Sequence, residues 1–305
     1  MVFDSRTLGS SLATVRQYLN RARYGLTGGE SRLMNEEWDN LILLDACRYD
    51  QFEQLHPFAA PLEARISPGS TTQEFLKSNF VDETHHDTVY VTANPMYRTV
   101  DMEGTFHAVV DVWESEWHEQ LRTVPPDPMA TAVLEAHERF PNKRIFAHFM
   151  QPHYPFIGET GRQISHAGYE WSYRLVTRGE GSREDPSVWD LLESGDIDLE
   201  VVRRAYDENL ELVFPHVERV LDAFDERTVI TSDHGNLVGE KIAPFDAPRY
   251  GHPRELYVDE LRKVPWLVVE GDESKRVESE PPGKTASADT EKIAERLSDL
   301  GYLDR

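Results

Sequence analysis

The feature that most constrains the fold is a series of short, continuously apolar runs that alternate with helical patterns. The first run, Leu41 to Leu44, reads LILL and lacks the apolar/polar alternation of a half-buried strand. It predicts a strand buried on both faces, as in a parallel sheet covered by helices. Similar runs begin at Thr88 (TVYVTA), Phe106 (FHAVVDV), Arg144 (RIFAHFM), Arg227 (RTVITS) and Val264 (VPWLVV). The pattern predicts an α/β fold with a doubly wound, mostly parallel sheet and helices on both faces.

The helical patterns between these runs suggest how the chain is organised. Apolar residues recur every three or four positions over residues 197–224, which predicts a long helix that Pro215 kinks or divides. A polar helical lead-in is expected before the first strand, with Leu8, Leu12, Val15 and Leu19 at helical spacing. The predicted parts are a lead-in at 1–38, an α/β domain at 39–305, a polar insertion or lid within it at 158–195, and a solvated linker at 271–288 before a last helix.

Composition excludes several classes of partner. The 305-residue chain carries 55 acidic and 32 basic residues, a formal net charge of −23. Such a charge disfavours nucleic acid and anionic lipid surfaces as partners, and it resembles the acidic surfaces of halophilic proteins. The N-terminal sequence has no apolar stretch of the length that a secretory signal or a membrane span needs, so we expect a cytoplasmic protein without a membrane span.

Polar residues follow three of the predicted strands. Asp45 comes after the first strand, His153 after RIFAHFM, and Asp233 with His234 after VITS. A single residue of this kind is usually a helix cap or a core residue, but ligands of open α/β sheets bind at the carboxyl ends of strands. Two carboxylates and an imidazole in one crevice would need a cation between them. Mixed oxygen and nitrogen ligands favour Mn²⁺ or Zn²⁺, with Mg²⁺ or Ca²⁺ as alternatives.

A candidate nucleophile lies in the segment SPGSTTQEFL, Ser67 to Leu76. Pro68 and Gly69 predict a turn, three hydroxyl residues follow, and a helix is expected to begin there. A hydroxyl at a helix N-terminus faces unpaired backbone N–H groups, which favour a bound anion and an alkoxide. The competing interpretation is an ordinary helix cap with Thr71 and Glu74 at the spacing of a capping box.

Several motifs occur in the order found in one enzyme family. They are LILLDACRYD, SPGSTTQEF, HFMQPHYPF, the long segment ending in TVITSDHGN, and YGHPRELYVDELRKVPWLVV, and they cover roughly Asn40 to Glu270. Together they resemble the sulfatase-like branch of the alkaline phosphatase superfamily. The resemblance implies a metal-dependent α/β core that cleaves sulfate or phosphate esters, or transfers phospho groups, through a covalent intermediate on a hydroxyl or formylglycine residue.

The resemblance also implies residue roles. It places the metal on Asp45, Thr71, Asp233 and His234, and it makes Thr71 the nucleophile. Because three hydroxyl residues are adjacent, Ser70 and Thr72 remain alternatives for that role. His153, in the PHYP segment, and His252, in GHPRELY, would contact the ester oxygens or protonate the leaving group.

The chain departs from the family pattern at two positions. The formylglycine signature needs a proline two residues after the modified Cys or Ser, whereas Cys47 is followed by RYD. Cys47 is therefore expected to be a small packing residue, and the chemistry of this segment is assigned to Asp45. Ala46 stands where many sulfatases have a second aspartate, a feature closer to the phosphotransferase-like members.

The sequence thus predicts a metal-dependent hydrolase or phosphotransferase acting on a small-molecule or glycan-type phosphate or sulfate ester through a covalent Thr intermediate. Alternatives are a two-metal phosphodiesterase or phosphomutase of the same superfamily, with His153 or His252 on the second ion, and a catalytically silent binding relative. Four further residues are assigned by default to turns and surface ion pairs: His85, His86, Asn94 and Arg98.

Overall fold

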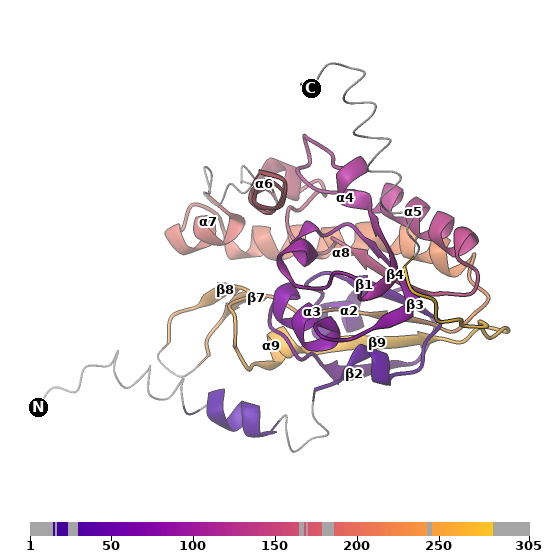
Figure 1. Cartoon of the computed structure of the whole chain (residues 1–305). Helices are drawn as coiled ribbons and strands as arrows, with labels where there is room; N and C mark the ends of the chain where they lie inside the picture. The colour runs from indigo at the N-terminus through magenta and orange to yellow at the C-terminus, as the bar shows by residue number, and fades with distance from the viewer. Residues whose placement is uncertain are drawn as a thin grey trace, which may run out of the picture.

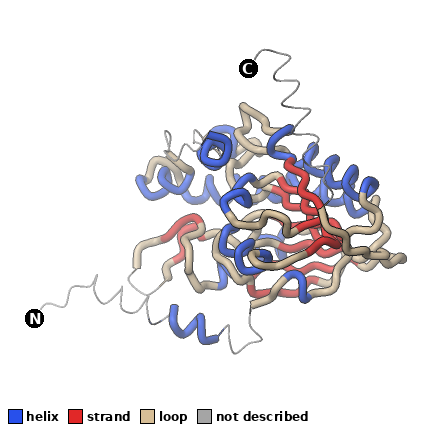
Figure 2. Tube along the Cα trace, in the orientation of Figure 1, coloured by secondary structure: helices blue, strands red, loops and turns tan. Residues whose placement is uncertain are grey.

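The computed structural model describes residues 15, 17–23, 30–164, 168, 170–178, 186–242 and 246–282. Its main element is a seven-stranded sheet in the order β2-β9-β6-β1-β5-β3-β4 (Figures 1 and 2). The strands are β1 Asn40–Leu44, β2 Leu62–Ile66, β3 His85–Thr92, β4 Phe106–Asp111, β5 Arg144–Phe149, β6 Thr228–Thr231 and β9 Lys263–Val269.

The centre of the sheet is parallel. The pairs β6/β1, β1/β5, β5/β3 and β3/β4 are all parallel, whereas β9 is antiparallel to both β6 and β2. Every residue of β1 is buried, as the run of four apolar residues predicts. The predicted doubly wound, mostly parallel α/β sheet is confirmed.

Helices cover both faces of the sheet (Figure 1). On one face α3 packs through Phe80, whose ring centroid lies 5.6 Å from that of Phe146 in β5. On the other, α8 packs beside α5. The helices are η1 Leu33–Asn35, α2 Tyr49–Leu55, α3 Thr72–Phe80, η2 Pro95–Thr99, α4 Val112–Ser115, α5 Pro126–Arg139, η3 Gly161–Gln163, α6 Glu170–Arg178, α7 Val188–Ser194, α8 Leu199–Leu221 and α9 Asp259–Arg262.

The structure differs from the sequence prediction in two details. The long helix α8 is a single element that contains Pro215 and is not divided by it. Pro215 lies on the exposed side of α8, where water can bond the carbonyl group that the proline leaves without a donor. The sequence also gave no sign of β2, or of the small hairpin of β7 (Leu237–Glu240) and β8 (Arg249–Gly251), which lies apart from the main sheet (Figure 2).

The predicted parts of the chain map onto the structure incompletely. Within 158–195, helices η3, α6 and α7 are formed, and residues 165–167, 169 and 179–185 lie outside the described residues. The linker at 271–288 is described as far as residue 282, and the predicted last helix lies beyond it. The division into a lead-in, a domain and an insertion stays a prediction.

Candidate metal centre and active site

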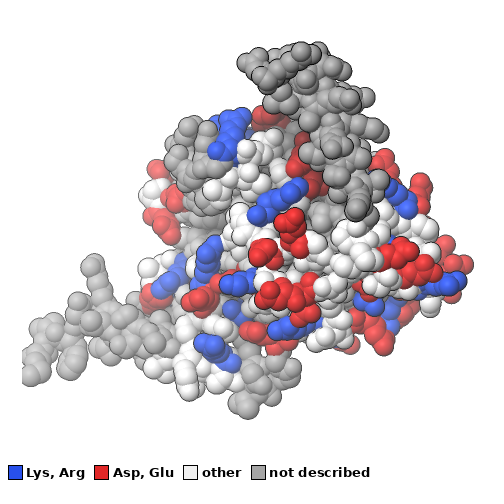
Figure 3. Space-filling model, in the orientation of Figure 1, with Lys and Arg blue, Asp and Glu red and all other residues white. Residues whose placement is uncertain are grey.

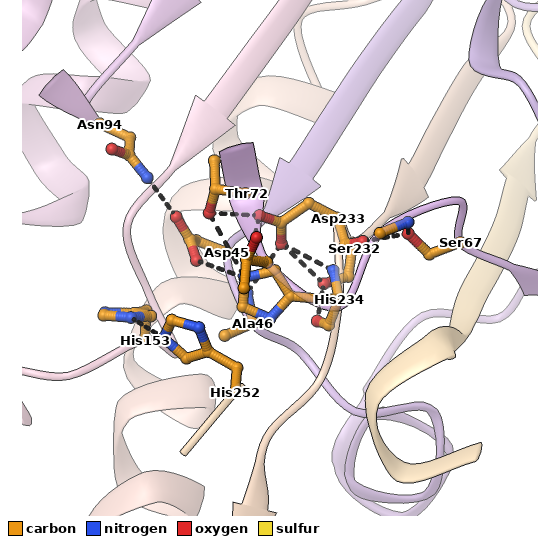
Figure 4. Close-up of polar contacts among 12 residues, drawn as sticks. Asp45, Ala46, Ser67, Thr72, Asn94, His153, Ser232, Asp233, His234 and His252 are labelled. Carbon is orange, nitrogen blue, oxygen red and sulfur yellow. Dashed lines mark hydrogen bonds and ion pairs between the residues drawn. The ribbon is translucent and has the colours of Figure 1, made fainter. Parts of the chain in front are cut away.

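The loops after β1 and β6 meet at the carboxyl edge of the sheet (Figure 4). These strands are parallel neighbours, with Leu43 opposite Thr231. Asp45 and Asp233 each follow the end of one of these strands by a short step, so they lie side by side. Both aspartates and His234 are completely buried. The convergence predicted from the strand ends is therefore present.

Asp233 uses its two oxygens differently. Its Oδ1 accepts backbone N–H bonds from Ala46 at 3.0 Å and His234 at 2.9 Å. Ala46 reaches it because its φ of 57° turns the backbone after β1 sharply. Oδ2 is left to accept the hydroxyl of Thr72 at 2.7 Å. The backbone thus holds one carboxylate oxygen and points the other into the centre of the cluster.

Asp45 is arranged in the same way. Its Oδ2 accepts the amide of Asn94 at 2.6 Å and lies 3.2 Å from Nε2 of His148. Its Oδ1 is buried and has no hydrogen-bond partner among the described residues. Burial alone would raise the pKa of Asp45, but His153, His148 and His234 outweigh that effect and hold the pKa well below its usual value. Asp45 therefore presents an unpaired anionic oxygen.

His234 completes the cluster. Its Nδ1 lies 2.8 Å from the carbonyl oxygen of Gly235, an acceptor, so Nδ1 carries the proton and Nε2 keeps its lone pair. Nε2 faces Oδ2 of Asp233 at 3.4 Å, Oδ1 of Asp45 at 3.9 Å and the Thr72 hydroxyl at 3.3 Å.

Two carboxylate oxygens, an imidazole nitrogen and a hydroxyl are a donor set suited to a divalent cation. The unpaired Oδ1 of Asp45 is an atom that such a cation would satisfy. The ligand atoms of Asp45, Asp233 and His148 also lie within 4.8 Å of one another. Both nitrogens of His148 are engaged by neighbours outside the centre of the cluster, whereas Nε2 of His234 points at the other cluster atoms. The cluster therefore fits a metal ion, with His234 as the favoured nitrogen donor.

The hydroxyl in this cluster belongs to Thr72, one residue after the predicted Thr71. Thr71 is the N-cap of α3, and its oxygen accepts the N–H of Glu74 at 3.3 Å. Ser70 Oγ lies 2.9 Å from Glu74 Oε2 and 2.8 Å from the carbonyl oxygen of Pro253, and its one proton is directed to these acceptors outside the cluster. The structure thus places the hydroxyl of Thr72 in the cluster and that of Thr71 outside it, and which of the three adjacent hydroxyl residues is the ligand and nucleophile stays a prediction.

The two other predicted histidines, the buried His153 and the partly buried His252, form a pair beside the cluster (Figure 4). Nε2 of His153 lies 3.1 Å from Nε2 of His252, and the rings of His252 and His234 are 4.6 Å apart between centroids. Nδ1 of His153 lies 2.5 Å from the carbonyl oxygen of Tyr154. Burial lowers the pKa of both His153 and His252, so both are neutral imidazoles near neutral pH.

Sequence reasoning missed two supporting residues. His148 lies in β5, donates toward Asp45 and contacts the hydroxyl of Tyr90 in β3, with 2.7 Å between that oxygen and Nδ1 of His148. The available signal was a histidine inside an otherwise apolar strand. Asn94 was interpreted as a turn residue; it does cap η2, and its amide also binds Asp45.

The remaining conspicuous residues lie outside the cluster. Cys47 is buried, and burial, together with the nearby charges of Asp50 and Asp233, raises the pKa of its thiol. This agrees with a packing residue. Arg98 forms an ion pair with Asp111 at 2.6 Å, in agreement with the predicted surface ion pair.

Acidic and basic side chains are interspersed among uncharged ones on the face shown in Figure 3. Across the described ranges, no helix has both the length and the apolar character needed to cross a bilayer. The cytoplasmic location stays a prediction.

Neither a protein-family profile nor a curated protein sequence matches this chain. Solved structures do resemble it. The integral membrane lipooligosaccharide phosphoethanolamine transferase A from Neisseria meningitidis is 14% identical with a TM-score of 0.49, over 81% of this chain and 50% of that one. This chain thus spans half of that protein.

Two further solved structures have similar sequence identities and TM-scores. The C-terminal periplasmic domain of EptC from Escherichia coli, in complex with Zn, is 13% identical with a TM-score of 0.45, over 79% of this chain and 75% of that one. The lipoteichoic acid synthase LtaP from Listeria monocytogenes is 10% identical with a TM-score of 0.42, over 86% and 73%. The likeness concerns the fold alone. The chain has an α/β fold similar to that of these structures, and membership of the sulfatase-like branch remains what the sequence motifs imply.

Proposed function

We propose that this protein is a metal-dependent enzyme that hydrolyses or transfers a phosphate or sulfate ester, with Thr72 as its nucleophile. One observation carries the proposal. The Thr72 hydroxyl lies 2.7 Å from Oδ2 of Asp233 and 3.3 Å from Nε2 of His234, at the first residue of α3. A hydroxyl in that position has a base for its proton and faces the unpaired N–H groups of a helix start.

Four side chains would hold the metal: Asp45, Thr72, Asp233 and His234. A bound divalent ion supplies positive charge where negative charge develops on the ester. The donor set favours Zn²⁺ or Mn²⁺, with Mg²⁺ or Ca²⁺ as alternatives, because one of the donors is an imidazole nitrogen.

Each of these residues has its own role in the proposed reaction. Asp233 would accept the proton of Thr72 while the hydroxyl oxygen attacks phosphorus or sulfur, the bond to the leaving alcohol breaks, and the departing alkoxide takes a proton from solvent. Water or an acceptor alcohol would then attack the Thr72 ester and release its proton to solvent, while the bond to Thr72 breaks and Asp233 returns its proton to the Thr72 oxygen. Asn94 and His148 fix the orientation of Asp45 throughout.

His153 and His252 are placed to contact the ester oxygens. Both are neutral near neutral pH and bring no fixed positive charge, and since Nδ1 of His153 carries its proton against the carbonyl oxygen of Tyr154, Nε2 of His153 is an acceptor. Their converging Nε2 atoms, 3.1 Å apart, equally suit a second cation. That observation supports the alternative of a two-metal phosphodiesterase or phosphomutase, and a metal-to-protein ratio near two would select it.

A catalytically silent relative is the weaker alternative, because the four donors and the histidine pair are brought together intact. The alcohol portion of the ester would contact the polar insertion at 158–195, since loops over the carboxyl edge of a sheet usually set specificity. A glycan-type or other hydrated ester suits the polar character of that insertion.

The experiment combines metal addition with trapping. Chelator-treated protein is supplied with Zn²⁺, Mn²⁺, Mg²⁺ or Ca²⁺ and mixed with an activated aryl phosphate or aryl sulfate. We expect metal-dependent release of the phenol and, after acid quenching, a phosphate or sulfate adduct on the peptide that contains Thr72. Turnover without metal, or an adduct on Thr71 or Ser70, would contradict the proposal.

A further inference from the structure

The two histidines beside the cluster come from separate loops. His153 follows β5 and His252 follows β8, and their Nε2 atoms are 3.1 Å apart. Nδ1 of His153 donates to the carbonyl oxygen of Tyr154 at 2.5 Å, so Nε2 of His153 is an acceptor. Nε2 of His252 therefore carries the proton that lies between the two rings. This contact exists only while the two loops keep a fixed separation.

A tryptophan from α7 lies against both loops, next to the histidines. The ring of Trp189 meets that of Tyr154, the residue after His153, edge-on with 6.0 Å between the ring centroids. The same indole covers Gly251, the residue before His252. A Cβ atom added to Gly251 would lie 3.2 Å from Cδ1 of Trp189. Trp189 thus contacts one chain neighbour of each histidine.

The backbone of Gly251 is suited to this contact. Its φ of 71° lies in the left-handed region, which glycine adopts far more readily than other residues. Because Gly251 has no side chain, the indole of Trp189 packs directly on the backbone of β8. A displaced indole would leave the backbone immediately before His252 without that support.

The helix that carries Trp189 is itself well fixed. Ser187 and Asp190 form a capping box at the start of α7, and Val188 and Leu192 are buried. Nε1 of Trp189 is buried and has no hydrogen-bond partner among the described residues. A buried indole N–H usually has an acceptor. The ring contacts, and not a polar bond, therefore account for the position of this indole.

We infer that Trp189 is a positioning residue that holds the loops of His153 and His252 at the separation their ring contact requires. Helix α7 lies within residues 158–195, the segment expected to contact the alcohol portion of the ester. The same segment would therefore set both the specificity of the site and the geometry of its histidines. The effect on turnover rests on the proposed function, whereas the effect on the ring contact does not.

Proton NMR of the full chain, supplied with diamagnetic Zn²⁺, measures the ring contact without turnover. The Nε2 proton of His252 lies between two rings, so it should exchange slowly with water and give a downfield signal that His252→Gln removes. We expect Trp189→Leu to abolish this signal. Trp189→Phe, which keeps an aromatic ring at the contact, should retain it. Leu192→Ala removes another buried side chain of α7 and, as the matched control, should also retain it.

Turnover of an aryl ester gives the second readout. Trp189→Leu should lower kcat by about 10-fold or more with bound metal unchanged, because the cluster ligands are not altered. Trp189→Phe should restore most of kcat, and Leu192→Ala should keep the kcat of the parent. Gly251→Ala tests the same contact from its other side, since its methyl group would displace the indole, and it should behave like Trp189→Leu. Thermal unfolding checks that each variant is folded.

Three results would overturn the inference. The His252 signal would be absent from the parent, or it would persist in both Trp189→Leu and Gly251→Ala. In the third, Trp189→Leu and Leu192→Ala would lose the signal and kcat to the same extent, which would make Trp189 a core residue only. A parent without turnover, whose His252 signal still depends on Trp189, would contradict the proposed function and support the positioning role.

Discussion

The hydroxyl of Thr72 lies 2.7 Å from Oδ2 of Asp233, whereas the hydroxyl of its neighbour Thr71 accepts the N–H of Glu74 at 3.3 Å. Two adjacent threonines therefore have different roles, and they serve as matched controls for each other. Thr72→Ala should reduce turnover by several orders of magnitude, because it removes the attacking oxygen. Thr71→Ala should cost ~1 kcal/mol of stability and leave turnover nearly unchanged. Kinetics on an aryl ester and urea unfolding measure the two effects, and the reverse pattern would restore Thr71 as nucleophile.

The second prediction concerns the metal. Asp233→Asn keeps the shape of the side chain but removes the anionic charge at Oδ2, so bound metal and activity should both fall steeply. Elemental analysis of the purified, folded variant measures the loss. Asp207→Asn is the control, since Asp207 accepts from Gln51 at 2.9 Å outside the cluster. Equal metal in Asp233→Asn and the parent would remove Asp233 from the ligand set.

How far the site could be predicted from the sequence depended on the kind of signal. Asp45 and Asp233 were predictable because parallel strands end at one edge of the sheet and the residues after β1 and β6 must meet there. Thr72 was only an alternative to Thr71, since three adjacent hydroxyl residues do not show in sequence which side chain faces the site. His148 was missed because a pattern of apolar residues does not show which buried side chain faces the site.

Whether a strand could be predicted also depended on the local pattern of its sequence. The central strands were predictable because each is an apolar run with no polar alternation. The edge strand β2 was not, because LEARI is partly exposed and carries two charged residues. The hairpin of β7 and β8 is held by long-range pairing, which leaves little local pattern in seven residues.

The third prediction tests the support of Asp45. Tyr90 and His148 are fully buried, and the Tyr90 hydroxyl lies 2.7 Å from Nδ1 of His148. Tyr90→Phe removes only that oxygen, so His148 loses the contact that orients it toward Asp45. Metal affinity should fall by ~10-fold while the fold is kept. Titration with metal of chelator-treated Tyr90→Phe measures the affinity. An unchanged affinity would make the Tyr90 hydroxyl a packing feature only.

The fourth prediction concerns Cys47, which is fully buried and whose backbone N–H donates to the Ser232 hydroxyl at 2.9 Å. A backbone bond survives a side-chain change, so Cys47→Ala should keep most activity and lose ~1 kcal/mol of stability. Iodoacetamide should label the native protein slowly and the urea-unfolded protein quickly. Loss of turnover in Cys47→Ala with metal content intact would return the thiol to the mechanism.

The last prediction concerns stability in acid. Burial would raise the pKa of Glu226, but Lys275 and His137 outweigh it, with Nζ of Lys275 at 3.7 Å and Nε2 of His137 at 3.1 Å, and the pKa is lowered. A lowered folded-state pKa stabilises the protein above the unfolded value of about 4.3, and this stabilisation is lost as pH falls through the folded-state pKa. Glu226→Gln should therefore be less stable than the parent at pH 7, by ~2 kcal/mol, because it leaves the buried amine of Lys275 without its anion.

The difference in the free energy of unfolding should shrink as the pH is lowered below about 4.3, where the parent also loses the charge of Glu226. Urea unfolding at a series of pH values and constant salt measures it. Glu200→Gln, in the exposed first turn of α8, is the control, and its difference from the parent should stay small throughout. A difference for Glu226→Gln that stays constant from pH 7 to pH 3 would show that the cost comes from lost packing and not from the charge on Glu226.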